Sequence, residues 1–200
     1  MCMKNASYRR NEFITYGHFL VKNKFKEITD NNSIIHINKP NGGVWSSPTI
    51  SEWGWIDWCQ AEEFRLDTFN IYTKWRLRNP DKILVIDSYG DLEKAMDKYG
   101  VNTVKPLSKD AIARLKLHGY SDADINRFNN RAEYRLDFWK IKMDGYDGVM
   151  LTAKGNWECH LPIGKRYKER SLIDLNSWDC ESMVVWNWNQ IKIIEKGRIF

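Results

Sequence analysis

The sequence lacks the local motifs that mark several common classes of enzyme. It contains no GxGxxG, GxxxxGKS/T, HExxH or GxSxG pattern, which argues against the nucleotide-binding, metalloprotease and hydrolase sites built on them. Its four histidines (His18, His36, His118 and His160) are scattered, and none lies four residues from another. We therefore expect no metal site built from local motifs.

Cysteine pairs and long apolar runs are also missing. The four cysteines (Cys2, Cys59, Cys159 and Cys180) form no CxxC pair and have no metal-ligand spacing, as is typical of reduced thiols in a cytosolic protein. No apolar run approaches the length of a membrane span, and residues 1–10 are polar and basic, without the apolar core of a secretory signal. We expect a cytoplasmic protein that does not contact a membrane.

The chain is rich in tryptophan and carries a moderate positive charge. Its 200 residues are 42% hydrophobic and 28% charged, which is typical of one globular domain. The net charge of +5 permits an anionic partner such as a dinucleotide or a nucleic acid, without proving one. Ten tryptophans gather mainly in residues 45–58 and 178–188. Such rings form cores, and they also stack on bases and nicotinamide.

Hydrophobic periodicity predicts strands near both ends of the chain and helices in the middle. Strands are expected at 13–18, 33–37, 44–48, 68–77, 82–87, 149–152, 156–163, 182–186 and 190–194, and helices at 56–66, 88–99, 109–118 and 122–142. Ser88 with Asp91 predicts a helix start, and Gly100 its end. The pattern indicates a single α+β domain over residues 1–200, with a helical insertion at roughly 88–142.

Three segments have residues suited to binding or chemistry. Ile14–His18 is a β-branched and aromatic strand, and Lys39–Pro48 joins two glycines to a strand with paired serines. Glycines allow close approach of a backbone, and hydroxyls provide short hydrogen-bonding groups. Glu181 opens an apolar strand, where a carboxylate can lie against a cleft. The alternative is an ordinary solvated acid at a strand end.

Two segments near the C-terminus match a known pattern. The sequence GYDGVM (145–150) is followed, after a loop, by ESMVVWNWNQIK (181–192). This pair resembles the ADP-ribosyltransferase family, in which a GYDGVI strand precedes a segment of the form E-x-h-V-h-N/D-x-x-Q-I-K, where h is hydrophobic. The family usually has Arg or His on the first strand and Ser or Tyr on the second. The resemblance covers roughly residues 13–50 and 140–195 and leaves out the middle.

The resemblance implies a reaction and a fold. The fold would be two packed, mostly antiparallel sheets with a helical insertion. NAD would donate ADP-ribose to a macromolecular acceptor, with release of nicotinamide. Cleavage of the nicotinamide–ribose bond passes through an oxocarbenium-like state, which a nearby carboxylate stabilises. Glu181 would be that carboxylate and would also hold a ribose hydroxyl.

The resemblance also implies roles for residues around Glu181. Tyr16 or His18 would bind the adenosine-side ribose or a phosphate, and which of the two does so is left open. Ser46 and Ser47 would support the nicotinamide pocket and position Glu181. The remaining candidates are Tyr72 for stacking on nicotinamide and Trp178 and Asp179 for recognition of the acceptor. An Asp at 179 is shorter than the Glu or Gln often found there, which puts an arginine acceptor in doubt.

A second class of function fits the same residues. The tryptophan clusters and the basic run Lys165–Arg170 could form a non-catalytic nucleic-acid-binding module. A nuclease is a third reading, which no cluster of acidic residues supports. The sequence leaves open whether the acceptor is protein or nucleic acid, the oligomeric state, and a role as toxin, viral effector or housekeeping enzyme.

Overall fold

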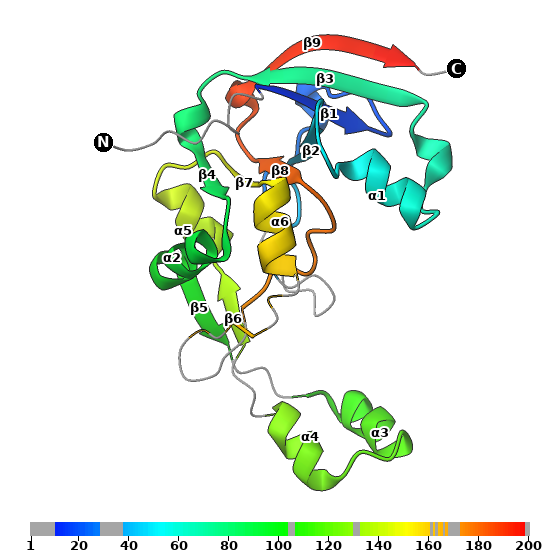
Figure 1. The fold of residues 1–200 in the computed structure, drawn as a ribbon, viewed down its shortest axis with the longest axis vertical. Helices are drawn as coiled ribbons and strands as arrows, with labels where there is room; N and C mark the ends of the chain where they lie inside the picture. The colour runs from blue at the N-terminus through cyan, green and yellow to red at the C-terminus, as the bar shows by residue number, and fades with distance from the viewer. Residues whose placement is uncertain are drawn as a thin grey trace.

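The computed structural model describes residues 11–28, 38–103, 107–129, 133–160, 162, 164–165, 167 and 173–198. These residues form a mixed structure with a mainly antiparallel seven-stranded sheet, a two-stranded sheet and six α-helices (Figure 1). The strands are β1 (Glu12–Tyr16), β2 (Val44–Pro48), β3 (Ile71–Leu77), β4 (Ile83–Ile86), β5 (Gly100–Thr103), β6 (Glu133–Leu136), β7 (Gly148–Leu151), β8 (Ser182–Val185) and β9 (Ile191–Arg198). The helices are α1 (Trp55–Ala61), α2 (Tyr89–Tyr99), α3 (Lys109–Leu117), α4 (Asp122–Asn129), α5 (Phe138–Met143) and α6 (Ala153–His160).

The large sheet has the order β4-β7-β8-β2-β1-β3-β9, and only β4 and β7 run parallel. It divides into two halves at the junction of β1 and β2. These two strands are joined by two residue pairs, Phe13↔Pro48 and Ile14↔Ser47, whereas β1 and β3 are joined by five. In Figure 1, β1, β3 and β9 cross the top of the molecule, while β4, β7 and β8 lie below them.

Two hydrophobic clusters cover the faces of the lower half. One lies on the side of α2, α5 and α6 and includes Leu92, Ile141 and Val184. The other combines residues of both halves, with Phe13 and Trp75 packed in the same cluster as Met183. The α+β class and the mainly antiparallel sheet are therefore confirmed. In place of the two packed sheets that were expected, the structure has one seven-stranded sheet and a small two-stranded sheet.

Helix α2 is predicted correctly by its end signals. The Ser88 hydroxyl accepts a hydrogen bond from the Asp91 N–H at 3.2 Å, and the helix ends at Tyr99, before Gly100. A Cβ atom at Gly100 would lie 2.2 Å from the Met96 carbonyl oxygen, so this position has no room for a larger residue. The predicted strands at β1, β3, β4 and β7–β9 are also present, with bounds shifted by one to four residues.

The predicted long helix at 122–142 is wrong. The structure places α4, β6 and α5 in this segment. β6 pairs with β5 over four residues, from Gly100↔Leu136 to Thr103↔Glu133. Asp137 then starts α5 by accepting a hydrogen bond from the Lys140 N–H at 3.0 Å. Pairing with a distant strand overrides the helical periodicity of this segment, which a local pattern does not reveal.

The predicted strand at 156–163 is also wrong, because α6 occupies most of it. The Thr152 hydroxyl accepts a hydrogen bond from the Gly155 N–H at 3.0 Å, which caps the start of this helix. A Cβ atom at Gly155 would lie 2.2 Å from the Ile86 carbonyl oxygen, so the glycine lets α6 pack directly on the end of β4. The predicted strand at 33–37 lies outside the described residues, as does most of the run 165–170.

Helices α3 and α4 extend away from the sheets in Figure 1. Within the described part of the chain, no helix is both long and apolar enough to cross a membrane.

Candidate functional site: a cleft between β1 and β2

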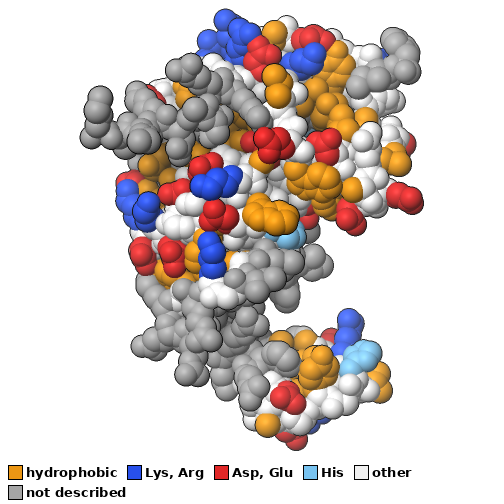
Figure 2. Space-filling model, in the orientation of Figure 1, with side chains coloured by type: hydrophobic (Ala, Val, Ile, Leu, Met, Phe, Trp, Pro, Cys, Tyr) orange, Lys and Arg blue, Asp and Glu red, His pale blue; other side chains and the backbone are white. Residues whose placement is uncertain are grey.

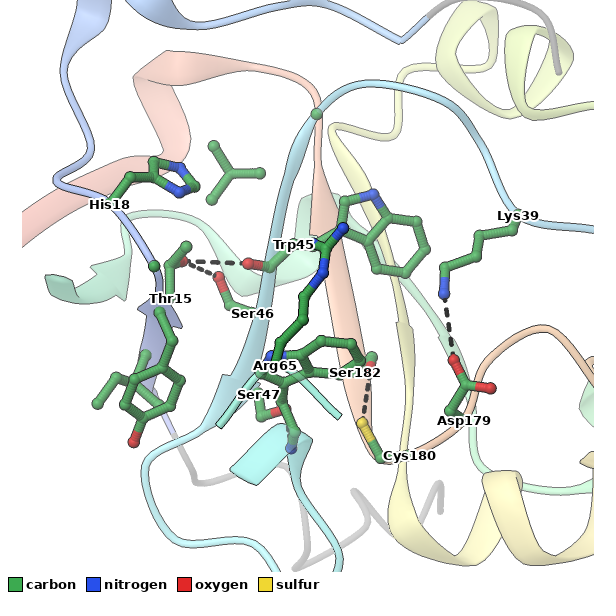
Figure 3. Close-up of a pocket in the computed structure, with 16 residues that line it drawn as sticks. Thr15, His18, Lys39, Trp45, Ser46, Ser47, Arg65, Asp179, Cys180 and Ser182 are labelled. Carbon is green, nitrogen blue, oxygen red and sulfur yellow. Dashed lines mark hydrogen bonds and ion pairs between the residues drawn. The ribbon is translucent and has the colours of Figure 1, made fainter. Parts of the chain in front are cut away.

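A cavity of about 410 Å³ lies where β1 and β2 separate (Figure 3). Beyond the pair Ile14↔Ser47 the two strands are no longer joined by ladder hydrogen bonds. Residues of β1, of β2 and of the loop before β8 line the opening. Its volume lies in the range of small-molecule sites, roughly 300–1,000 Å³. The interrupted ladder therefore forms a cleft of suitable size for a ligand.

Side-chain hydrogen bonds replace the missing ladder at the floor of the cleft. The Trp75 Nε1–H donates to the Ser46 hydroxyl at 3.0 Å, and Ser46 and Thr15 join their hydroxyls at 2.6 Å. Thr15 in turn donates to the Trp45 carbonyl oxygen at 3.1 Å, so we infer that Ser46 donates to Thr15. All the members of this chain are buried except Trp45, which is half-buried. Ser46 therefore holds the two strands together at the base of the cleft.

Ser47 connects the cleft to the start of two further elements. Its hydroxyl donates to the Glu181 carbonyl oxygen and accepts from the Trp55 N–H, each at 2.9 Å. Trp55 is the first residue of α1, and Glu181 directly precedes β8. Ser47 thus fixes the backbone of Glu181 relative to β2.

Glu181 is buried beside the cleft and is hydrogen-bonded at several atoms. Its side chain is 5% exposed, so it is not a solvated acid at a strand end. The carboxylate accepts from the Ser51 hydroxyl at 2.5 Å, and the backbone N–H donates to the Trp53 carbonyl oxygen at 2.9 Å. Its neighbours Cys180 and Ser182 line the cavity, whereas Glu181 itself is directed to the loop after β2.

Tyr16 and His18 lie on the β1 side of the cavity. Burial, together with the nearby Asp57 carboxylate and Tyr72, raises the pKa of Tyr16 to about 12. The phenol is therefore protonated at neutral pH and can donate a hydrogen bond. His18 is exposed at the end of β1, on the opposite side of Trp45 from Lys39 (Figure 3).

Two other predicted residues lie away from the cavity. Tyr72 pairs with Tyr16 across β1 and β3, but its hydroxyl donates to Glu195 of β9. Trp178 is 1% exposed, packs edge-to-face on Trp45 at 4.8 Å and donates to the Asn38 carbonyl oxygen at 2.5 Å. The Trp178 ring thus belongs to the core. Asp179, the other predicted acceptor residue, lines the cavity.

Two cations at the cavity were not identified from the sequence. Lys39 donates to the Ser177 carbonyl oxygen at 2.9 Å and lies 3.4 Å from the Asp179 carboxylate. Arg65 follows α1 and has a left-handed backbone, with φ of 49°. Figure 3 shows both side chains at the cleft. Lys39 belongs to a segment that the sequence singled out for its glycines, whereas no local signal marks Arg65.

The cleft also contains a thiol. Burial raises the pKa of Cys180 to about 11, although hydrogen bonds with Ser182 and Ser47 lower it. At neutral pH the group is a thiol and not a thiolate, so it is a poor nucleophile. Among the described residues, no group of three or more His, Cys, Asp or Glu side chains could hold a metal ion. The cleft thus presents hydroxyls, a phenol, two cations and the Asp179 carboxylate that pairs with one of them.

The segments GYDGVM and ESMVVWNWNQIK form one structural unit. β7 and β8 pair from Gly148↔Val185 to Leu151↔Ser182. Asp147 accepts hydrogen bonds from the side-chain amides of Asn187, at 2.9 Å, and Gln190, at 2.5 Å. Asp147 therefore ties the start of β7 to the end of β8 and has a structural part.

Comparison of the chain with models of known protein families, with curated proteins and with solved structures found no match.

Proposed function

We propose that this chain transfers ADP-ribose from NAD to a macromolecular acceptor and releases nicotinamide. The supporting observation is the adjacency of three segments that are far apart in the sequence. Ile14–His18, Lys39–Pro48 and the strand that follows Glu181 lie on β1, β2 and β8, which are neighbours in the sheet. The two N-terminal segments and the segment led by Glu181 thus meet around one cleft.

The charges at the cleft suit a dinucleotide. Lys39 and Arg65 line the cavity, and the pyrophosphate of NAD carries two negative charges that such cations bind well. The Tyr16 phenol, which stays protonated, can donate to a ribose or phosphate oxygen. These groups provide a binding site for the phosphates and sugars of NAD.

Glu181 supplies the carboxylate of the proposed reaction. Its backbone is held by Ser47, which lines the cleft, and its carboxylate by Ser51. In the proposed complex, a ribose hydroxyl takes the place of the Ser51 hydroxyl. The carboxylate then stabilises the positive charge that develops on the ribose as nicotinamide leaves.

The alternative of a nucleic-acid-binding module requires exposed rings. Trp75, Trp178 and Trp186 are each at most 2% exposed, so they cannot stack on bases. Of the clustered tryptophans, Trp178 and Trp186 thus serve the core, whereas those at 45–58 are half-buried or exposed, so the alternative loses only the support of the second cluster.

The test is the substitution Glu181→Gln. Gln keeps the size of the side chain and an oxygen for Ser51, but it removes the negative charge. We expect release of nicotinamide from NAD to fall by roughly 100-fold or more, while NAD binding, measured by calorimetry, persists. Glu52→Gln, at an exposed acid on the same loop, is the control and should leave the rate unchanged.

Transfer itself is measured with labelled NAD in lysate, followed by separate digestion with protease and nuclease. Label released by one of these digestions identifies the class of acceptor. Full activity in Glu181→Gln, or a wild-type protein that does not bind NAD, would contradict the proposal.

A further inference from the structure

A second concavity, which we call the Trp groove, lies between α1 and α6. It has a volume of about 940 Å³, and its walls include Trp53 and Trp58 on one side and Trp157 on the other. Figure 2 shows hydrophobic and acidic side chains intermingled on the face of the molecule that carries these helices. The groove is therefore both aromatic and charged.

The rings of the Trp groove are not needed for the core. Helix α6 buries Gly155, Asn156 and Cys159, whereas Trp157 is 86% exposed. Trp53 is 39% exposed, and its Nε1–H donates to the Asp179 carbonyl oxygen at 3.2 Å. Exposed large aromatic side chains that gather at one concavity often mark a binding surface.

Two of these rings are fixed in position before any ligand arrives. The hydrogen bond to Asp179 holds Trp53, and Trp58 stacks on Trp55 with ring centroids 5.1 Å apart and an angle of 20° between planes. Rings that are already ordered lose little conformational entropy when a partner binds. Trp53 and Trp58 thus form a rigid aromatic wall.

The walls of the groove carry more carboxylates than lysines, and lysines outside the walls pair with two of these carboxylates, Lys39 with Asp179 and Lys154 with Glu158. The walls contain three carboxylates, Glu62, Glu158 and Asp179, and one lysine, Lys165. Glu158 is held by the Tyr89 N–H at 3.1 Å and by Lys165 at 3.2 Å. Hydrogen bonds from these groups lower the pKa of Glu158, so it is ionised at neutral pH. An excess of carboxylates repels a phosphate backbone and attracts a cation, which also binds to the faces of tryptophan rings.

The Trp groove lies next to the proposed reaction site. Asp179 lines both the groove and the cleft between β1 and β2. The Trp53 carbonyl oxygen accepts the Glu181 N–H at 2.9 Å. Glu181 therefore lies between a cleft suited to an anionic dinucleotide and a groove suited to a cationic chain.

We propose that the Trp groove binds a lysine- or arginine-bearing segment of a partner protein, with a cationic side chain stacked on Trp157 between the carboxylates. The proposal that the groove binds such a segment is argued from the groove alone and does not depend on the proposed reaction. That this partner is the acceptor of ADP-ribose rests on the proposed function. The acceptor is then a protein and not a nucleic acid.

The experiment measures binding of a short peptide of alternating arginine and glycine, in the absence of NAD, by calorimetry. A matched peptide with glutamate in place of arginine and an oligothymidine are tested beside it. We expect only the arginine peptide to bind, more weakly as salt rises. Trp157→Ala should weaken it by roughly 5- to 30-fold, and Glu62→Gln by about 2- to 5-fold.

Trp139→Ala is the control, because Trp139 is 53% exposed on α5 and lies outside the groove. It should leave the affinity for the peptide unchanged. NAD binding by Trp157→Ala should equal that of the wild type, since Trp157 does not line the cleft.

The inference is overturned if the arginine peptide does not bind, if Trp157→Ala does not weaken it, or if oligothymidine binds in its place. Peptide binding that depends on Trp157, in a protein that does not turn over NAD, would support the groove and refute the proposed reaction. The two proposals therefore fail separately.

Discussion

The pair β7–β8 and the pair β1–β2 both carry segments that the sequence singled out, and they are built in different ways. β7 and β8 are joined at four consecutive residue pairs. β1 and β2 are joined at two and then separate around the cavity.

This difference separates the residues that hold strands together from those that border a cavity. On the closed pair, Asp147 has partners in Asn187 and Gln190. On the open pair, Tyr16, His18, Lys39 and Arg65 surround a cavity. We infer that the first set maintains the fold and that the second, in which Lys39 and Arg65 also contact other residues of the protein, borders a space that a ligand can occupy.

Gly148→Ala should damage the closed pair most. A Cβ atom at Gly148 would lie 2.5 Å from the Val184 carbonyl oxygen on β8, and backbone cannot move aside easily. We expect the free energy of unfolding to fall by about 3 kcal/mol, measured by urea denaturation. Gly90→Ala in α2, where the nearest atom is 3.7 Å away, is the control and should not destabilise. A Gly148→Ala protein as stable as the wild type would show that the strands have room to separate.

Replacing both cations of the open pair should affect binding and not folding. In Lys39→Gln with Arg65→Gln, we expect the affinity for NAD to fall by roughly 10- to 100-fold, because the phosphates lose two charge-assisted partners. The free energy of unfolding should change little. Lys94→Gln, at a side chain that is 81% exposed on α2, is the control for net charge. Equal NAD affinity in the double variant and the wild type would mean that the cleft does not bind phosphates.

Asp147→Asn should weaken the closed pair moderately. One oxygen that accepts a hydrogen bond becomes an NH₂ group that faces a donor, either Asn187 or Gln190. We expect the free energy of unfolding to fall by about 1–2 kcal/mol, with NAD affinity unchanged when measured on folded protein. A loss of NAD affinity without a loss of stability would move Asp147 from the structural set to the binding set.

The smallest effect is a pH dependence at Cys180. Its folded-state pKa is raised from 9.0 to about 11, so folding favours the protonated thiol. This contribution is fully present below pH 9 and is lost as pH rises from 9 through 11. Between pH 8 and pH 10, the free energy of unfolding of the wild type should fall by about 1 kcal/mol more than that of Cys180→Ala. Urea denaturation of both proteins at several pH values measures this difference, and parallel pH profiles would contradict it.

Signals in the sequence predict an element correctly where the residues that define it are close together in the chain. Ser88, Asp91 and Gly100 define α2 because capping involves residues only three or four apart. The prediction for segment 122–142 fails because β6 forms by pairing with β5, whose residues lie at least thirty positions earlier in the chain. Five site residues predicted from the sequence do meet at one cavity: Tyr16, His18, Ser46, Ser47 and Asp179. Arg65 lies in no motif, and only the turn after α1 brings it there.

Periodicity, capping and short motifs depend on near neighbours, and they were enough to predict the α+β class, the ends of α2 and most of the segments that surround the cleft. The tertiary structure alone decided that β1 and β2 separate, that Trp178 belongs to the core and that Trp157 is exposed. It also decided that Glu181 is held by Ser51 between a cationic cleft and an acidic groove. These features depend on which distant strands pair and which face of each element is covered, and no local pattern records that choice.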